Sequence, residues 1–383
     1  MPMLLERLIK FFTSLRLTVV LLVLSLVLVF AGTLAEVHLG LYKAQTEFFR
    51  SFFIYWHPAQ AAWKIPVFPG GYLLGAALLL NLIAAHASRF KLTRDKIGLW
   101  IIHAGLILLI LGQLATDMFA SESQMHLREG QMKNYSEADR MDELAISDIT
   151  DKKLETVVAI SQRLLAQKGD IHNDQLPFVV RVKEFYANSV LTTNAAPDSA
   201  RVNADSGFGA GLWWKPVPRE TAMDRRDMPS ALVEIVTPQG SLGTWLVSDW
   251  LEQPQTFSAG GRTWQLQLRP ERFYLPFSLR LLQFHHDVYE GTDIPKNFSS
   301  QLLLNRPDTG ERRQVLIYMN NPLRYDGRTF YQASFDTDNQ GTILQVVKNP
   351  GWLTPYLACI LIATGMVVQF LSHLVPFLRR RMT

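Results

Sequence analysis

Four long apolar runs dominate the hydrophobic pattern of this 383-residue chain. Each has about 20 residues or more, enough for a helix rising about 1.5 Å per residue to cross a hydrocarbon core of about 30 Å. The first run exceeds the apolar core of a secretory signal peptide, about 7 to 15 residues, and so indicates a retained anchor. The pattern predicts transmembrane helices at Leu15–Ala35, Pro69–Ser88, Ile97–Phe119 and Trp352–Val375.

The segment between the third and fourth runs has a different pattern. From Phe178 onward, short apolar or alternating stretches are separated by Pro, Gly, Asn and Asp, which is typical of strands and turns. Nine stretches predict strands: Phe178–Phe185, Ala231–Val236, Leu242–Val247, Thr263–Leu268, Phe277–Phe284, Phe298–Leu304, Gln314–Tyr318, Thr329–Phe335 and Thr342–Val347. They favour an antiparallel sandwich or open barrel.

Three further stretches carry weaker expectations. The polar region before the strands contains one helical candidate, Lys153–Gln167, and Ala195–Arg226 is expected to be a long loop. Leu39–Pro66 is rich in aromatic residues but too polar to span a membrane. It predicts an amphipathic helix at the membrane surface, with packing against the domain outside the membrane as the alternative.

The fold expected is therefore an α+β membrane protein with four transmembrane helices, three N-terminal and one C-terminal. A large extracytoplasmic β-rich domain lies between the third and the fourth. The expected domains are residues 1–119 with three helices at about 15–35, 69–88 and 97–119, residues 120–350 with the β-rich domain, and residues 351–383 with the last helix and a basic tail.

Basic residues indicate the orientation. They precede the first run, fill the short connection Arg89–Lys96 and end the chain at Arg379, Arg380 and Arg381. The positive-inside rule then places both termini in the cytoplasm and the β-rich domain on the other side of the membrane. The net charge of +4 comes from these flanks, because 28 basic and 32 acidic residues lie elsewhere. No surface resembles a nucleic-acid site, and no nucleic acid is expected as a partner.

Thiol and zinc-thiolate chemistry are excluded by the cysteine count. The chain has a single cysteine, Cys359, within the fourth apolar run. It therefore has no disulfide within the chain, no CxxC pair and no CxxCH haem-attachment sequence. No Ser, His and carboxylate spacing indicates a nucleophilic triad, so no catalytic residue is assigned.

Histidines are the remaining candidates for chemistry, and His103 is foremost because it lies inside the third run. At about six residues from the cytoplasmic end it is roughly 9 Å deep, where an ionisable side chain indicates function. A neutral imidazole there suits a haem axial ligand, and a hydrogen bond to a neighbouring helix is the structural alternative. His86, near the cytoplasmic end of the second run, is either interfacial or an assisting ligand. A ligand role for His285 or His286 is left open.

Several segments carry a family resemblance that covers nearly the whole chain. They are Leu15–Thr33, Leu80–Phe90, Gly98–Gly112, Asn321–Phe335 and Asn349–Gly365. In order and spacing they resemble the ResB (CcsB) family of system II cytochrome c biogenesis. One departure is the absence of a tryptophan-rich haem-handling motif, since Trp213 and Trp214 stand alone.

The resemblance implies a subunit that works with a ResC/CcsA-type membrane partner. Together they would carry haem b across the membrane, binding it transiently, and present it to apocytochrome c with its CxxCH sequence. His103 matches the family's transmembrane histidine, which implies an axial ligand to the haem iron. The chain is then a non-catalytic or co-catalytic subunit.

Two other classes compete with this interpretation. In the first, four helices anchor an extracytoplasmic β domain that acts as a scaffold or sensor without haem. The second is a transporter, which one mid-span histidine and the expected absence of intramembrane acids disfavour.

Overall fold

The computed structural model describes residues 2–56, 58, 63–89, 93, 96–151, 155–222, 225–292 and 295–382. The chain forms two compact units. A helical unit comprises Met1–Ser121, Thr221–Met223 and Lys348–Thr383, and a β unit comprises Glu122–Glu220 and Asp224–Val347. Lys91, Arg94 and His57 lie outside the described residues.

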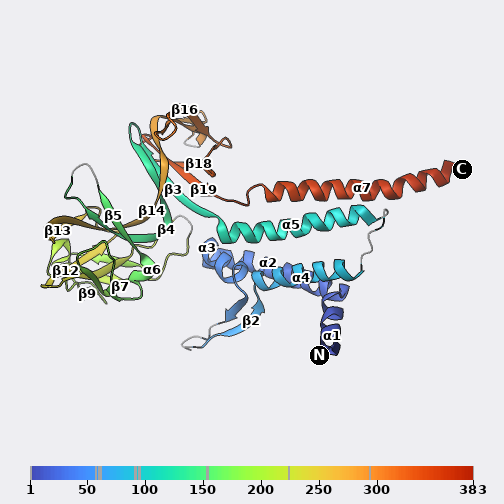
Figure 1. Cartoon of the computed structure of the whole chain (residues 1–383), viewed down its shortest axis with the longest axis horizontal. Coiled ribbons are helices and arrows are strands. Elements are labelled where there is room, and N and C mark those ends of the chain that lie inside the picture. Colours follow the sequence, from blue (N-terminus) through green and yellow to red (C-terminus); the bar gives the residue numbers. More distant parts are fainter. Residues whose placement is uncertain are drawn as a thin grey trace. The chain divides into compact units, whose positions relative to one another are not determined.

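The helical unit contains, among its described residues, four helices that are long and apolar enough to cross a membrane. Few of their residues are buried in the isolated chain, as expected for surfaces that contact lipid. The long helices are α2 (Leu15–Leu39), α4 (Gly71–Arg89), α5 (Ile97–Phe119) and α7 (Thr354–Met382), with α1 (Pro2–Phe12) before them (Figure 1). The chain is therefore a multi-pass membrane protein.

The long helices pack in two pairs. Helix α4 packs mainly against α2 through buried leucines that include Leu21, Leu28 and Leu74. Helix α5 packs mainly against α7, and the buried glycines Gly98 and Gly105 of α5 allow the close approach. A Cβ atom at Gly105 would lie 2.9 Å from the carbonyl oxygen of Ala358, so the two backbones leave no room for a side chain there.

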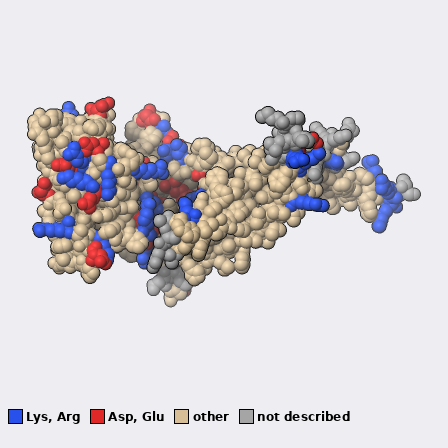
Figure 2. All heavy atoms as spheres, turned by 90° about the horizontal axis from the view of Figure 1, so that it is seen from below, with Lys and Arg blue, Asp and Glu red and all other residues tan. Residues whose placement is uncertain are grey.

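Charged side chains are scarce along the middle of the helical unit. Figure 2 shows a long tan surface over the helices, with Lys and Arg gathered toward the end of this unit that carries the C-terminus. Arg379, Arg380 and Arg381 form the last turn of α7. This distribution is typical of membrane helices with basic residues at one face of the bilayer.

The connection between α2 and α4 is a short helical segment followed by a hairpin, so the amphipathic helix predicted for Leu39–Pro66 is wrong. Its elements are α3 (Leu41–Ala44), the π-helical turn η1 (Gln45–Phe49), β1 (Phe53–Trp56) and β2 (Ile65–Pro69). The two strands pair antiparallel. Pro66 and Pro69 disfavour a helix, and the aromatic residues of β1 suit a strand.

The described part of the β unit contains a ten-stranded antiparallel sheet that curls into an almost closed barrel, together with smaller sheets of four and three strands. The large sheet comprises β3 (Ser121–Arg128), β4 (Met132–Asp148), β5 (Thr156–Ser161), β13 (Gln255–Ala259), β14 (Arg262–Val288), β15 (Pro295–Arg306), β16 (Glu311–Tyr318), β17 (Leu323–Tyr325), β18 (Arg328–Phe335) and β19 (Gly341–Lys348). The four-stranded sheet comprises β6 (Gly169–Ile171), β7 (Val179–Tyr186), β11 (Ser230–Thr237) and β12 (Gly240–Ser248). The small sheet comprises β8 (Ser189–Thr192), β9 (Ala200–Arg201) and β10 (Trp213–Pro216).

The β unit contains two large hydrophobic cores, and the 27-residue strand β14 contributes to both. Its first half supplies Trp264, Leu266 and Leu268 to one core. Its second half supplies Phe277 and Leu279, among others, to the other core. The prediction of apolar helices flanking a β-rich, barrel-like domain is confirmed.

The nine predicted strands coincide with strands of the structure, except that Phe178 precedes β7 and that Thr263–Leu268 and Phe277–Phe284 are parts of the single strand β14. Two predictions for the intervening regions are wrong. The helix predicted for Lys153–Gln167 is, over its described part, strand β5 followed by the four-residue helix α6 (Gln162–Leu165). The β-branched residues of β5, which alternate between buried and exposed positions, favour the strand. The predicted loop Ala195–Arg226 contains β9, the 3₁₀ turn η3 (Gly207–Gly209) and β10.

Candidate functional site

The two histidines singled out from the second and third spans lie together in the structure. The imidazole rings of His86 on α4 and His103 on α5 have centroids 4.2 Å apart, with their planes at 51°. Trp100, one turn before His103, meets the His86 ring edge to face at 5.1 Å. His86 is only 6% exposed. It is therefore buried at the contact between α4 and α5 instead of lying at the interface with water.

The backbone of each helix fixes the orientation of its histidine. The Nδ1 atom of His103 lies 2.7 Å from the carbonyl oxygen of Leu99, and the Nδ1 atom of His86 lies 3.1 Å from that of Leu82. A carbonyl oxygen can only accept a hydrogen bond, so Nδ1 is the donor in both rings. Each neutral imidazole then carries its lone pair on Nε2, the tautomer that suits a metal ligand.

The face of α5 that carries His103 is turned away from α7. At about 100° per residue, His103 lies nearly opposite Gly98 and Gly105, which contact α7. His103 therefore projects toward α4, while the glycine face of α5 packs against α7. The surroundings of the histidine pair are apolar helix surfaces and the Trp100 indole, which suit a flat, largely apolar ligand.

An acidic side chain also lies within a span, so the expectation that the spans contain no acid is wrong. Asp117 is two residues before the end of α5 and only 12% exposed. It accepts a hydrogen bond from Tyr72 of α4 and pairs with Arg50, whose Nε lies 2.8 Å from its carboxylate. Asp117 was visible in the sequence, and its position inside the apolar run was the signal that could have identified it.

The histidines of the β unit do not form a comparable cluster. His126 pairs with Asp336 at 2.9 Å, and His286 lies 3.0 Å from Asn339 while stacking on Phe335. His285 is exposed on the other face of the same strand. Among the described residues, no group of three or more His, Cys, Asp or Glu side chains could hold a metal ion.

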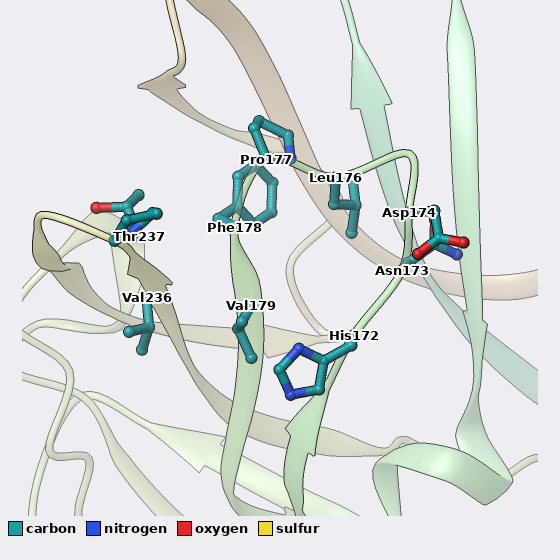
Figure 3. A pocket seen from close by; sticks show the side chains of 10 residues that line it. His172, Asn173, Asp174, Leu176, Pro177, Phe178, Val179, Val236 and Thr237 are labelled. Carbon is teal, nitrogen blue, oxygen red and sulfur yellow. The ribbon is translucent and has the colours of Figure 1, made fainter.

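The β unit also contains an open cleft of about 500 Å³, shown in Figure 3. His172 and Asp174, from the connection between β6 and β7, lie on one side of it, and Val236 and Thr237 of β11 lie on the other. Both ionisable side chains are exposed. Among the described residues that line this cleft, the polar side chains are not buried, so the helical unit holds the stronger candidate site.

Trp213 and Trp214 have structural positions in β10. Trp214 is 2% exposed and packs against Tyr186, with ring centroids 4.6 Å apart. It belongs to a small core that also contains Leu232 and Leu246. Trp214 therefore contributes to the hydrophobic packing beneath the small sheet.

Comparison with known proteins shows similarity to a protein family and to an individual protein. The model of the ResB-like family matches residues 248–343, from the last residue of β12 into β19. Protein NrfI of Wolinella succinogenes is 27% identical over 309 residues, which cover 78% of this chain. The chain spans only 30% of the length of that relative. Both matches agree with the resemblance to the ResB family inferred from the sequence.

Proposed function

We propose that this chain acts in cytochrome c biogenesis as a membrane subunit that holds haem b transiently through His103, with His86 assisting. The haem would pass to apocytochrome c in concert with a ResC/CcsA-type membrane partner. The family match and the similarity to NrfI support the cytochrome c role. The observation that carries the haem site is the meeting of two oriented imidazoles inside the membrane helices.

The chemistry of the paired residues fits haem. Both imidazoles direct Nδ1 to a helix carbonyl and so carry the lone pair on Nε2, as an axial ligand requires. Neutral imidazoles also bring no net charge into the membrane. When bound, the haem supplies the iron and the vinyl groups, while this chain supplies ligation, orientation and an apolar environment.

The separation of the two rings limits how they can act. A histidine nitrogen binds a metal at about 2 Å, so two imidazoles on opposite sides of one iron have ring centroids roughly 6 Å apart. His86 and His103 are at 4.2 Å and tilted together. In this arrangement they do not fit as the two axial ligands of the same iron. We therefore assign His103 as this chain's ligand and expect the second ligand to come from the partner.

The same proposal includes the cellular location. The basic side chains gathered at one end of the helical unit support cytoplasmic termini in a bacterial cytoplasmic membrane. The β domain would then lie on the opposite side, where apocytochrome c receives its haem. His86 and His103 would be nearer the cytoplasmic face, where haem enters.

The test is the absorption spectrum of the detergent-purified chain, alone and co-expressed with a ResC/CcsA-type partner. Haem bands should be lost in His103→Gly and return when imidazole is added, because free imidazole can occupy the position of the missing side chain. His373→Gly is the matched control, since His373 is an exposed histidine of α7 that bonds Gln369. Its spectrum should match that of the wild type.

Two outcomes would contradict the proposal. Haem bands that persist unchanged in His103→Gly would remove His103 from the site. A complete absence of haem from every wild-type sample, with or without the partner, would favour a membrane-anchored β-domain scaffold or sensor.

A further inference from the structure

The two helix pairs of the helical unit meet along a seam between α4 and α5. At one end of the seam His86 contacts His103 and Trp100. At the other end Tyr72 donates a hydrogen bond to Asp117. Helix α4 packs mainly on α2, and α5 mainly on α7, and these two polar contacts link side chains of one pair to side chains of the other.

Asp117 joins three segments of the chain at its end of the seam. It accepts a hydrogen bond from Tyr72 at the start of α4 and forms an ion pair with Arg50, which directly follows η1. The backbone N–H of Arg50 bonds the carbonyl of Gln45 at 2.8 Å, and the backbone N–H of Tyr72 bonds the carbonyl of Ser51 at 3.1 Å. The donors that hold the carboxylate are thus themselves fixed by the turn between η1 and the hairpin.

The spacing of the two contacts is the same on both helices. Tyr72 and His86 are 14 residues apart on α4, and His103 and Asp117 are 14 residues apart on α5. Fourteen residues of α-helix rise about 21 Å. Because α4 and α5 run antiparallel, one relative position of the helices satisfies both contacts, and a slip of one turn, about 5.4 Å, breaks both.

We propose that Asp117, Tyr72 and Arg50 are positioning residues that set the register of α4 against α5 and thereby bring His86 to His103. The inference rests on the proposed function only for its consequence for haem. A carboxylate in a largely buried position of a span needs its partners, which gives the contact a strong preference for one geometry. The ionic contact at one side of the membrane therefore controls the histidine pair near the other.

The register can be measured without haem. Cys359→Ser removes the single cysteine, and His86→Cys with His103→Cys then places two thiols at the seam. Dibromobimane becomes fluorescent only when it joins two nearby thiols, so its fluorescence per labelled chain reports how often the two positions meet. In this background, Asp117→Asn and Tyr72→Phe should each lower the cross-linking yield, measured as fluorescence per labelled chain, about five-fold. This ratio corresponds to roughly 1 kcal/mol.

Matched controls separate positioning from general damage. Glu47→Gln removes an exposed carboxylate of η1 that pairs with Lys43 at 3.8 Å, and it should leave the yield unchanged. Asp117→Glu keeps the carboxylate and should retain most of the yield. Arg50→Gln, at a residue whose side chain is 51% exposed, provides a second variant if the Asp117 variants do not fold. The inference would be overturned if Asp117→Asn gave the wild-type cross-linking yield. If Asp117→Asn does not fold, a wild-type yield in folded Arg50→Gln would overturn it instead.

A haem readout in the natural histidine background separates this inference from the proposed function. If cross-linking falls in Asp117→Asn while no sample binds haem, the register inference stands and the haem proposal fails. If wild-type chains bind haem through His103 and cross-linking does not depend on Asp117, the haem proposal stands and the register inference fails. If both hold, Asp117→Asn should alter the haem absorption bands and Glu47→Gln should not.

Discussion

The close packing of α5 against α7 makes the substitution Gly105→Ala a sensitive test of the helical unit. The added Cβ would lie 2.7 Å from Cγ1 of Ile362, 2.9 Å from the carbonyl oxygen of Ala358 and 3.1 Å from the backbone nitrogen of Ile362. Two of these atoms are backbone, so the helices must separate. Overpacking of this kind costs about 1–3 kcal/mol.

Gly75→Ala is the matched control, because a Cβ at Gly75 of α4 meets nothing within 4 Å. Both substitutions gain the helix propensity of alanine, about 1 kcal/mol, and this gain cancels in the comparison. We therefore expect Gly105→Ala to have a free energy of unfolding about 1–3 kcal/mol lower than that of Gly75→Ala.

Unfolding of both variants in mixed detergent micelles with rising dodecyl sulfate, followed by circular dichroism, measures this difference. Gly98→Ala should behave like Gly105→Ala, since its Cβ would lie 2.6 Å from the backbone nitrogen of Gln369. Equal free energies for Gly105→Ala and Gly75→Ala would refute the packing of α5 on α7.

Two further predictions concern the β unit. Burial raises the pKa of Asp142 from 3.8 to about 7, although Arg226 beside it opposes the shift. The folded chain then holds a proton that the unfolded chain releases between about pH 4 and pH 7, so stability should fall as the pH rises through this window. Denaturant unfolding followed by tryptophan fluorescence should show this slope in the wild type and a flatter one in Asp142→Asn, and an unchanged slope would contradict the assignment. Phe277→Ala, at a side chain 1% exposed, should lower the free energy of unfolding by about 3–5 kcal/mol, whereas Phe208→Ala, at 52% exposure, should change it by less than about 0.5 kcal/mol in the same measurement.

The spans and the later strands were predictable because lipid and a protein core both require apolar side chains in regular patterns. Strands β3 and β4 were missed because they carry many polar residues. In β4 the buried Asp142 and Glu143 pair with Arg226 and Arg269, which lie far away in the sequence. Composition shows the charges but not the pairing that makes their burial tolerable.

The residues of the candidate site could be predicted from the sequence, but their arrangement in space could not. His103 is evident from its apolar surroundings alone. His86 reads as interfacial, since nothing in its local sequence reveals that α4 turns it toward α5. Its burial follows from the register of two helices, which depends on contacts such as Tyr72 with Asp117 that are distant along each helix.

Strand β14 couples the folding of the two halves of the β unit. The strand lends side chains to two hydrophobic cores and pairs with β4 along most of its length. If one core were lost, β14 would lose hydrogen-bonded partner strands and would become less ordered. The other core, which contains side chains of the same strand, would then be destabilised as well. The two halves of the β unit are thus expected to unfold as a single cooperative unit, so that a substitution that destabilises either core lowers the stability of the whole β unit.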